Sequence, residues 1–112
     1  MPLVIKQRTV SDVVILDLIG RLWILDLPLR DKMNGFLTDG NRQFVLNLAG
    51  VNYIDSSGLG TLVSGYTTLV SSKGEMKLLH LTERVHELMH ITKLLTVFDV
   101  FTDEAAALRS FR

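Results

Sequence analysis

Two short segments of this 112-residue chain carry residue types whose spacing could do chemistry. The first is the segment 55–60, with the sequence Asp-Ser-Ser-Gly-Leu-Gly, which we expect to join a strand to a helix that begins near Ser57. A helix N-terminus presents unpaired N–H groups and the positive end of the helix dipole, so it favours an anion or an added phosphate. Ser56 lies where such a phosphate could be held.

The same segment also has a simpler interpretation as a helix cap. Asp55 or one of the serines would cap the helix, and Gly58 and Gly60 would permit a tight entry. The second serine is more than a cap requires. No lysine follows the glycines, as in a phosphate-binding P-loop, and no glycine stands two residues before either serine, as in a nucleophile elbow. The usual signatures of nucleotide hydrolysis and acyl transfer are therefore absent.

The second segment matches a zinc motif: His86 and His90 would be ligands on adjacent helical turns, and Glu87 would be a catalytic base. The glycine and histidine that extend this motif in many zinc proteases do not follow. Helical phase instead predicts a buried face made of Val85, Leu88 and Met89. The histidines would then lie on a flank and Glu87 in solvent, with Arg84 an ordinary solvated charge. A small zinc hydrolase is the less favoured alternative, and we expect no metal, cofactor or catalysis.

Composition narrows the class of partner. Apolar residues make up 47% of the chain and charged residues 21%, as in an ordinary globular domain rather than a disordered one. Twelve basic residues balance twelve acidic ones, which disfavours a nucleic-acid binder. There is no cysteine, no apolar run long enough to cross a membrane and no signal-peptide pattern at the start. We expect a cytoplasmic protein with no membrane contact.

The elements that must position these segments follow from hydrophobic period and turn residues. We predict an antiparallel pair of strands joined through residues 9–12. A helix capped by Asp26 follows, and a later helix has a buried stripe and Gly74 as its C-cap. The stripe consists of Leu59, Leu62, Val63, Tyr66 and Val70. The strands are predicted at 3–8, 13–19, 43–48, 76–81 and 97–101, and a loop is expected at 49–54.

This order, ββαβαβαβα, predicts an α/β domain with about five strands in a mixed, mostly parallel sheet and about four helices. Trp23, the only tryptophan, lies in an apolar loop after the second strand. A single aromatic residue is most often buried, but loops beside a functional turn also hold partner anchors.

The segment 51–60 and the Gly-Glu-Met-Lys-Leu run at 74–78 resemble the STAS domain of bacterial anti-sigma factor antagonists. The resemblance extends over nearly the whole chain, including the Gly20-Arg21-Leu22 turn and the Ile-Thr-Lys-Leu segment at 91–94. It implies a single STAS-like domain over residues 1–112. In this family the serine after the aspartate, here Ser56, is phosphorylated by an anti-sigma factor that is itself a serine kinase.

The resemblance further implies that the unphosphorylated form binds the kinase and so frees a sigma factor, and that a serine phosphatase resets the switch. The partner-binding residues would be Asp55, Ser56, Ser57, Gly58, Leu59, Arg21, Trp23 and Asp26, with Leu59 exposed at the first helical turn. The protein would be a monomer or weak dimer.

One departure from the family concerns the turn after the second strand. Many members carry an acidic residue there, whereas this chain has Gly20-Arg21-Leu22-Trp23, with Asp26 as a partial substitute. Charge matching at this edge would help to set partner choice. A constitutive STAS adaptor or a stressosome-like scaffold subunit therefore stays an alternative, and a sulfate-transporter STAS domain is less favoured.

Overall fold

The computed structural model describes residues 3–23 and 27–111, and within them a mixed five-stranded sheet in which the strands follow their order in the chain. The first two strands are antiparallel and the other neighbours are parallel. This confirms the predicted class and order of elements. The strands are β1 (Val4–Val10), β2 (Val13–Leu22), β3 (Gln43–Ile54), β4 (Glu75–Leu79) and β5 (Asp99–Phe101).

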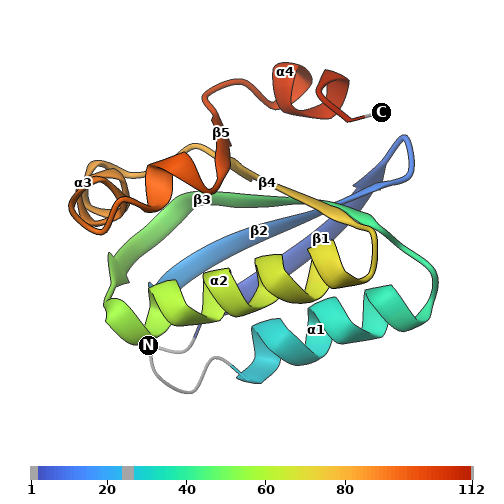
Figure 1. Ribbon diagram of the computed structural model, residues 1–112, viewed down its shortest axis with the longest axis horizontal. Helices are drawn as coiled ribbons and strands as arrows, with labels where there is room; N and C mark the ends of the chain where they lie inside the picture. Colours follow the sequence, from blue (N-terminus) through green and yellow to red (C-terminus); the bar gives the residue numbers. More distant parts are fainter. Residues whose placement is uncertain (1–2, 24–26, 112) are drawn as a thin grey trace.

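The helices lie on both sides of the sheet (Figure 1). They are α1 (Leu27–Thr38), α2 (Ser56–Ser71), α3 (Glu83–Ile91) and α4 (Glu104–Arg109), with a 3-10 turn, η1 (Leu94–Thr96), before β5. Helices α1 and α2 run side by side along one face, α3 packs near one end of β3, and the short α4 lies across the opposite face. The predicted capping residue of α1, Asp26, lies outside the described residues.

The β1–β2 hairpin closes through Ser11 and Asp12, whose φ angles are 49° and 69°. Two successive left-handed residues define the tight turn that matches the twist of antiparallel strands, and aspartate tolerates this conformation. The turn fixes a register in which Val10 pairs with Val13, so the predicted hairpin is confirmed.

The alternation of side chains along β2 divides the core in two. Val14, Leu16 and Leu18 face α1 and α2 in the larger cluster, while Val13 and Ile15 face α4 in the smaller one. All five are at most 3% exposed. Both faces of β2 are therefore buried along most of the strand, which explains why its sequence is an almost continuous apolar run.

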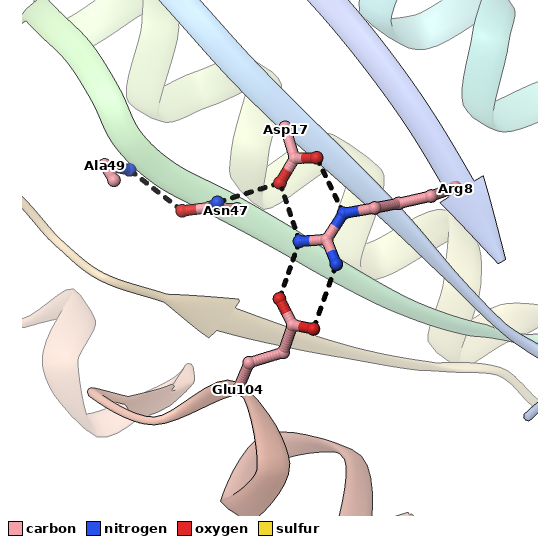
Figure 2. A network of polar contacts seen from close by, with 5 residues as sticks. All are labelled: Arg8, Asp17, Asn47, Ala49 and Glu104. Atoms are coloured by element: carbon pink, nitrogen blue, oxygen red, sulfur yellow. Dashed lines mark hydrogen bonds and ion pairs between the residues drawn. The ribbon is translucent and has the colours of Figure 1, made fainter. Parts of the chain in front are cut away.

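A polar network attaches α4 to the sheet (Figure 2). The Arg8 guanidinium of β1 donates two hydrogen bonds to Asp17 of β2, at 2.8 and 3.1 Å, and two to Glu104 of α4, at 2.9 and 2.6 Å. Asn47 of β3 donates to Asp17 at 2.8 Å and accepts from the Ala49 N–H at 3.1 Å. Arg8 thus joins the first hairpin to α4, 96 residues further along the chain, with paired, charge-assisted hydrogen bonds.

Strand β3 is longer than the sequence pattern predicted, because it continues through residues 49–54 instead of ending in a loop there. Its pairing with β2 shifts register between Asp17 and Ile19 and again between Gly20 and Arg21. Each shift places one additional residue in β3, so the regular alternation of apolar and polar residues is lost while the ladder continues. The longer strand carries the chain directly to the start of α2.

Two predictions about helix α2 are wrong: its last buried residue and its C-cap. Val70, predicted to be inward, is 51% exposed, and the buried position at this turn is Leu69. The helix ends before Gly74, and the left-handed residue after it is Lys73, with a φ of 62°. Gly74 is required for a different reason: a Cβ there would lie 2.7 Å from the Arg42 carbonyl oxygen.

Candidate functional site

Asp55 is the residue that caps α2 at the junction with β3. Its backbone is extended, and its Oδ1 accepts hydrogen bonds from the Ser57 hydroxyl at 2.6 Å and from the Gly58 N–H at 2.9 Å. These donors, the Ser57 hydroxyl first, hold the pKa of the Asp55 carboxyl below its usual value. Asp55 is therefore an ionised cap, as the simpler interpretation of this segment predicted.

The two serines at the start of α2 have different environments. The Ser57 hydroxyl donates to Asp55, and its side chain is partly buried. Ser56, the first residue of the helix, is exposed, and its hydroxyl makes no hydrogen bond with any part of the chain that the structure describes. Of this pair, only the Ser56 hydroxyl is thus open to a reagent from solvent without breaking the cap.

Gly58 allows α2 to begin directly against the end of β2. A Cβ at this position would lie 2.1 Å from the Leu22 carbonyl oxygen and 3.1 Å from the Ile54 side chain. Leu22 and Ile54 are themselves buried and are paired in the sheet. Only glycine allows this approach, which fixes the first turn of α2 against the end of β2. Gly58 is itself buried and offers no side chain to a partner.

The prediction that Leu59 contributes to the contact surface is wrong. It was expected to be exposed at the first turn of α2, but it is 4% exposed and belongs to the larger core cluster. The spacing of apolar residues already placed Leu59 at the start of the buried stripe of this helix, and burial against the sheet is the stronger requirement.

Arg21 and Trp23, two other predicted contact residues, lie at the end of β2 and just beyond it. Trp23 is 38% exposed, so the single tryptophan is not a core residue. The Arg21 guanidinium carbon lies 5.0 Å from the centroid of the Trp23 ring and 4.6 Å from that of Tyr53. Arg84 of α3 approaches the same Tyr53 ring, at 5.5 Å.

Tyr53 and Arg84 were missed as candidate site residues. The pairing of Arg21 with Tyr53 depends on the two register shifts between β2 and β3, which no local sequence pattern reveals. Arg84 was predicted to be an ordinary solvated charge, and it lies next to Tyr53 only because α3 packs near the end of β3.

The zinc motif segment lies on α3 with its polar residues outward. His86, Glu87 and His90 are all exposed, while Val85 and Met89 are buried, as the helical phase predicted. Across residues 3–23 and 27–111, no three histidine, cysteine, aspartate or glutamate side chains are grouped closely enough to hold a metal ion. A zinc site would need a third ligand that this part of the chain does not bring to the two histidines.

Comparison with known proteins gives the family. The family model for the STAS domain matches residues 5–107. The chain belongs to the STAS domain family. An anti-sigma-B factor antagonist of Staphylococcus aureus is 33% identical over 76 residues, which is 67% of this chain and 70% of that protein. An anti-sigma F factor antagonist of Paenibacillus polymyxa is 31% identical over 64 residues, 57% of this chain and 55% of that protein.

Solved structures of other proteins share the fold described above. A Thermotoga maritima protein proposed to be an anti-sigma factor antagonist has a TM-score of 0.84 at 29% identity, covering 94% of this chain and 92% of that one. SpoIIAA of Bacillus, solved in its phosphorylated form, has a TM-score of 0.76 at 20% identity, covering 97% and 100%. The second likeness shows the fold alone. Within the described residues, none of this STAS protein's helices has the length and apolar character needed to cross a bilayer.

Proposed function

We propose that this STAS protein is an anti-sigma factor antagonist whose binding to a kinase-type anti-sigma factor is switched off by phosphorylation of Ser56. The observation that carries the proposal is the difference between the two serines: Ser56 is exposed with a free hydroxyl among the described residues, whereas the Ser57 hydroxyl is held by Asp55. The relatives named above as anti-sigma factor antagonists support the class of partner. The chain itself supplies no catalysis in this proposal.

The local electrostatics explain how one phosphate would act. A phosphoserine adds about −1.5 to −2 charge at neutral pH. The N-terminus of α2 tolerates that charge through its N–H groups and dipole, so the fold would survive the modification. In a docked interface the same charge lies close to the ionised Asp55, with desolvation and repulsion opposing binding. A loss of about 3 kcal/mol lowers affinity by more than a hundredfold.

The cycle needs two other proteins. An anti-sigma factor with serine kinase activity would be both the binding partner and the enzyme that modifies Ser56, and a serine phosphatase would restore the binding form. The antagonist would act as a monomer or weak dimer in the cytoplasm, with no nucleic-acid or membrane partner and no cofactor.

The proposal is tested by incubating the purified protein with each anti-sigma factor of the same genome and ATP, then mapping phosphate by intact mass and peptide fragmentation. We expect one phosphate, on Ser56, and none in the Ser56→Ala variant. Ser57→Ala is the matched control and should still be modified, since its hydroxyl serves the cap. Stable binding without any phosphate on Ser56 would instead identify a constitutive STAS adaptor.

A further inference from the structure

Four side chains at one end of the sheet form a compact cationic and aromatic group, which we name the arginine–aromatic surface: Arg21, Trp23, Tyr53 and Arg84. The Arg21 guanidinium lies against both aromatic rings, at 5.0 and 4.6 Å, and Arg84 lies 5.5 Å from the Tyr53 ring. Each guanidinium is thus held over a π face, an arrangement that fixes its position and leaves its N–H edges available to an anion.

Neither arginine has a carboxylate partner among the described residues. The ion pairs in this part of the chain involve Arg8 and Lys77, whose partners lie elsewhere on the sheet and on α4. Glu87, one turn beyond Arg84 on α3, lines the same shallow hollow but makes no ion pair with it. Arg8, by contrast, donates four hydrogen bonds to two carboxylates.

The position of Arg84 also argues against a role in folding. It is the second residue of α3, in the first turn after the Thr82 cap. A positive charge there opposes the helix dipole, and an acidic residue would suit the helix better. The charge of Arg84 therefore opposes the α3 dipole, and its contact in the described residues is the Tyr53 ring rather than a carboxylate.

Apolar surface lies on both sides of the group. One hollow is lined by Ile19, Gly20, Arg21, Gly50, Asn52 and Tyr53, and the other by Ile54, Arg84, Glu87, Leu88 and Ile91. Ile19 and Ile91 are 40% and 65% exposed. Exposed apolar residues around aromatic and arginine side chains match the composition of protein–protein interfaces.

The arginine–aromatic surface lies at the end of the sheet where α2 begins. Tyr53 precedes Asp55 by two residues at the end of β3, and Leu22, between Arg21 and Trp23, lies against Gly58 at the start of α2. The proposed switch and the arginine–aromatic surface therefore lie at the same end of the sheet.

We propose that the arginine–aromatic surface binds an acidic segment of the anti-sigma factor, so that Arg21 and Arg84 pair with its carboxylates while Trp23 and Tyr53 pack against its apolar side chains. This inference rests on the proposed function, and it specifies that the contacting segment of the partner is negatively charged. Two guanidinium groups without a carboxylate partner in the described residues suit a carboxylate pair, whereas a nucleic acid needs a longer basic track than this chain of zero net charge offers.

The test measures the affinity of the anti-sigma factor for Arg21→Glu and Arg84→Glu by titration calorimetry at low and high salt. We expect each variant to bind at least tenfold more weakly than wild type at low salt, with the difference reduced at high salt. Arg109→Glu, at an exposed arginine of α4 outside the arginine–aromatic surface, is the matched control and should change affinity less than twofold. Arg21→Lys keeps the charge without the planar fork and should give an intermediate affinity.

Folding is checked separately by thermal unfolding. Arg84→Glu removes a charge that opposes the α3 dipole but adds a like charge near Glu87, so its midpoint should stay close to wild type. If both glutamate variants fold and bind as tightly as wild type, the arginine–aromatic surface is not the contact, although the proposed function stands. If wild type itself binds no anti-sigma factor, the proposed function fails instead. Restored affinity between Arg84→Glu and an anti-sigma factor carrying an acidic-to-lysine change would establish the pairing.

Discussion

Gly58 and Leu22 approach each other so closely that a Cβ at position 58 would lie 2.1 Å from the Leu22 carbonyl oxygen. This contact joins the end of β2 to the first turn of α2, and it connects two parts of the candidate site. Arg21 and Trp23 flank the leucine on one side, and Ser56 stands two residues before the glycine on the other.

The first prediction concerns this contact. Gly58→Ala should lower the free energy of unfolding by about 2 kcal/mol or more, because a methyl group cannot occupy the space of a backbone carbonyl and α2 must move. Gly60→Ala, in the same helix with no atom within 4 Å of the added Cβ, is the matched control. It should raise stability by about 0.5 to 1 kcal/mol. Urea unfolding of both variants measures the difference, and equal effects would show that Gly58 has no special role.

The second prediction concerns the cap of α2. Asp55→Ala should lower the free energy of unfolding by about 1 kcal/mol, because it leaves the Gly58 N–H and the Ser57 hydroxyl without their acceptor. Asp55→Asn keeps an acceptor oxygen and should lose less. Chemical denaturation at neutral pH makes the comparison. A stable Asp55→Ala variant would mean that another group caps the helix.

The third prediction is a pH dependence of the network in Figure 2. The Arg8 guanidinium, through its hydrogen bonds, holds the pKa of Asp17 and of Glu104 below their usual values. At acidic pH the folded state therefore binds fewer protons than the unfolded state. The contribution of these two carboxylates to the free energy of unfolding is fully present above about pH 4 to 5 and is lost as the pH falls further.

Arg8→Gln tests this dependence. Arg8 is 40% exposed at its side chain, so solvent screening limits the expected loss at neutral pH to about 1 kcal/mol. The difference from wild type should shrink as the pH falls below about 4, because the lowered pKa values of both carboxyls lose their stabilising effect as the carboxyls take up protons. Urea unfolding at several pH values measures it, and a difference that stays constant as the pH falls through this range would contradict the assignment.

Much of the fold could be predicted because local and tertiary preferences agree. The hairpin turn at Ser11 and Asp12, the Thr82 cap and the inward Val85 and Met89 all follow from residue types at short range. The end of β3 could not be predicted, because its two register shifts depend on pairing with β2 and hide the alternating pattern.

Part of the candidate site could also be predicted from local sequence, and part could not. The serine pair and its acidic cap come from one continuous segment, and the structure gives each residue a distinct environment. Leu59 was expected both in the buried stripe of α2 and in the contact surface, and the structure shows that the helical spacing was the correct guide. The meeting of Tyr53 with Arg84 depends on two elements far apart in the sequence.

The central claim is that a phosphate on Ser56 separates this protein from its anti-sigma factor. The most direct measurement is the affinity of the purified anti-sigma factor for the unmodified protein and for the same protein stoichiometrically phosphorylated on Ser56, with circular dichroism to show that both are folded. We predict an unchanged fold and an affinity at least about a hundredfold lower for the phosphorylated form, a difference of about 3 kcal/mol. Equal affinities of two folded forms would contradict the account.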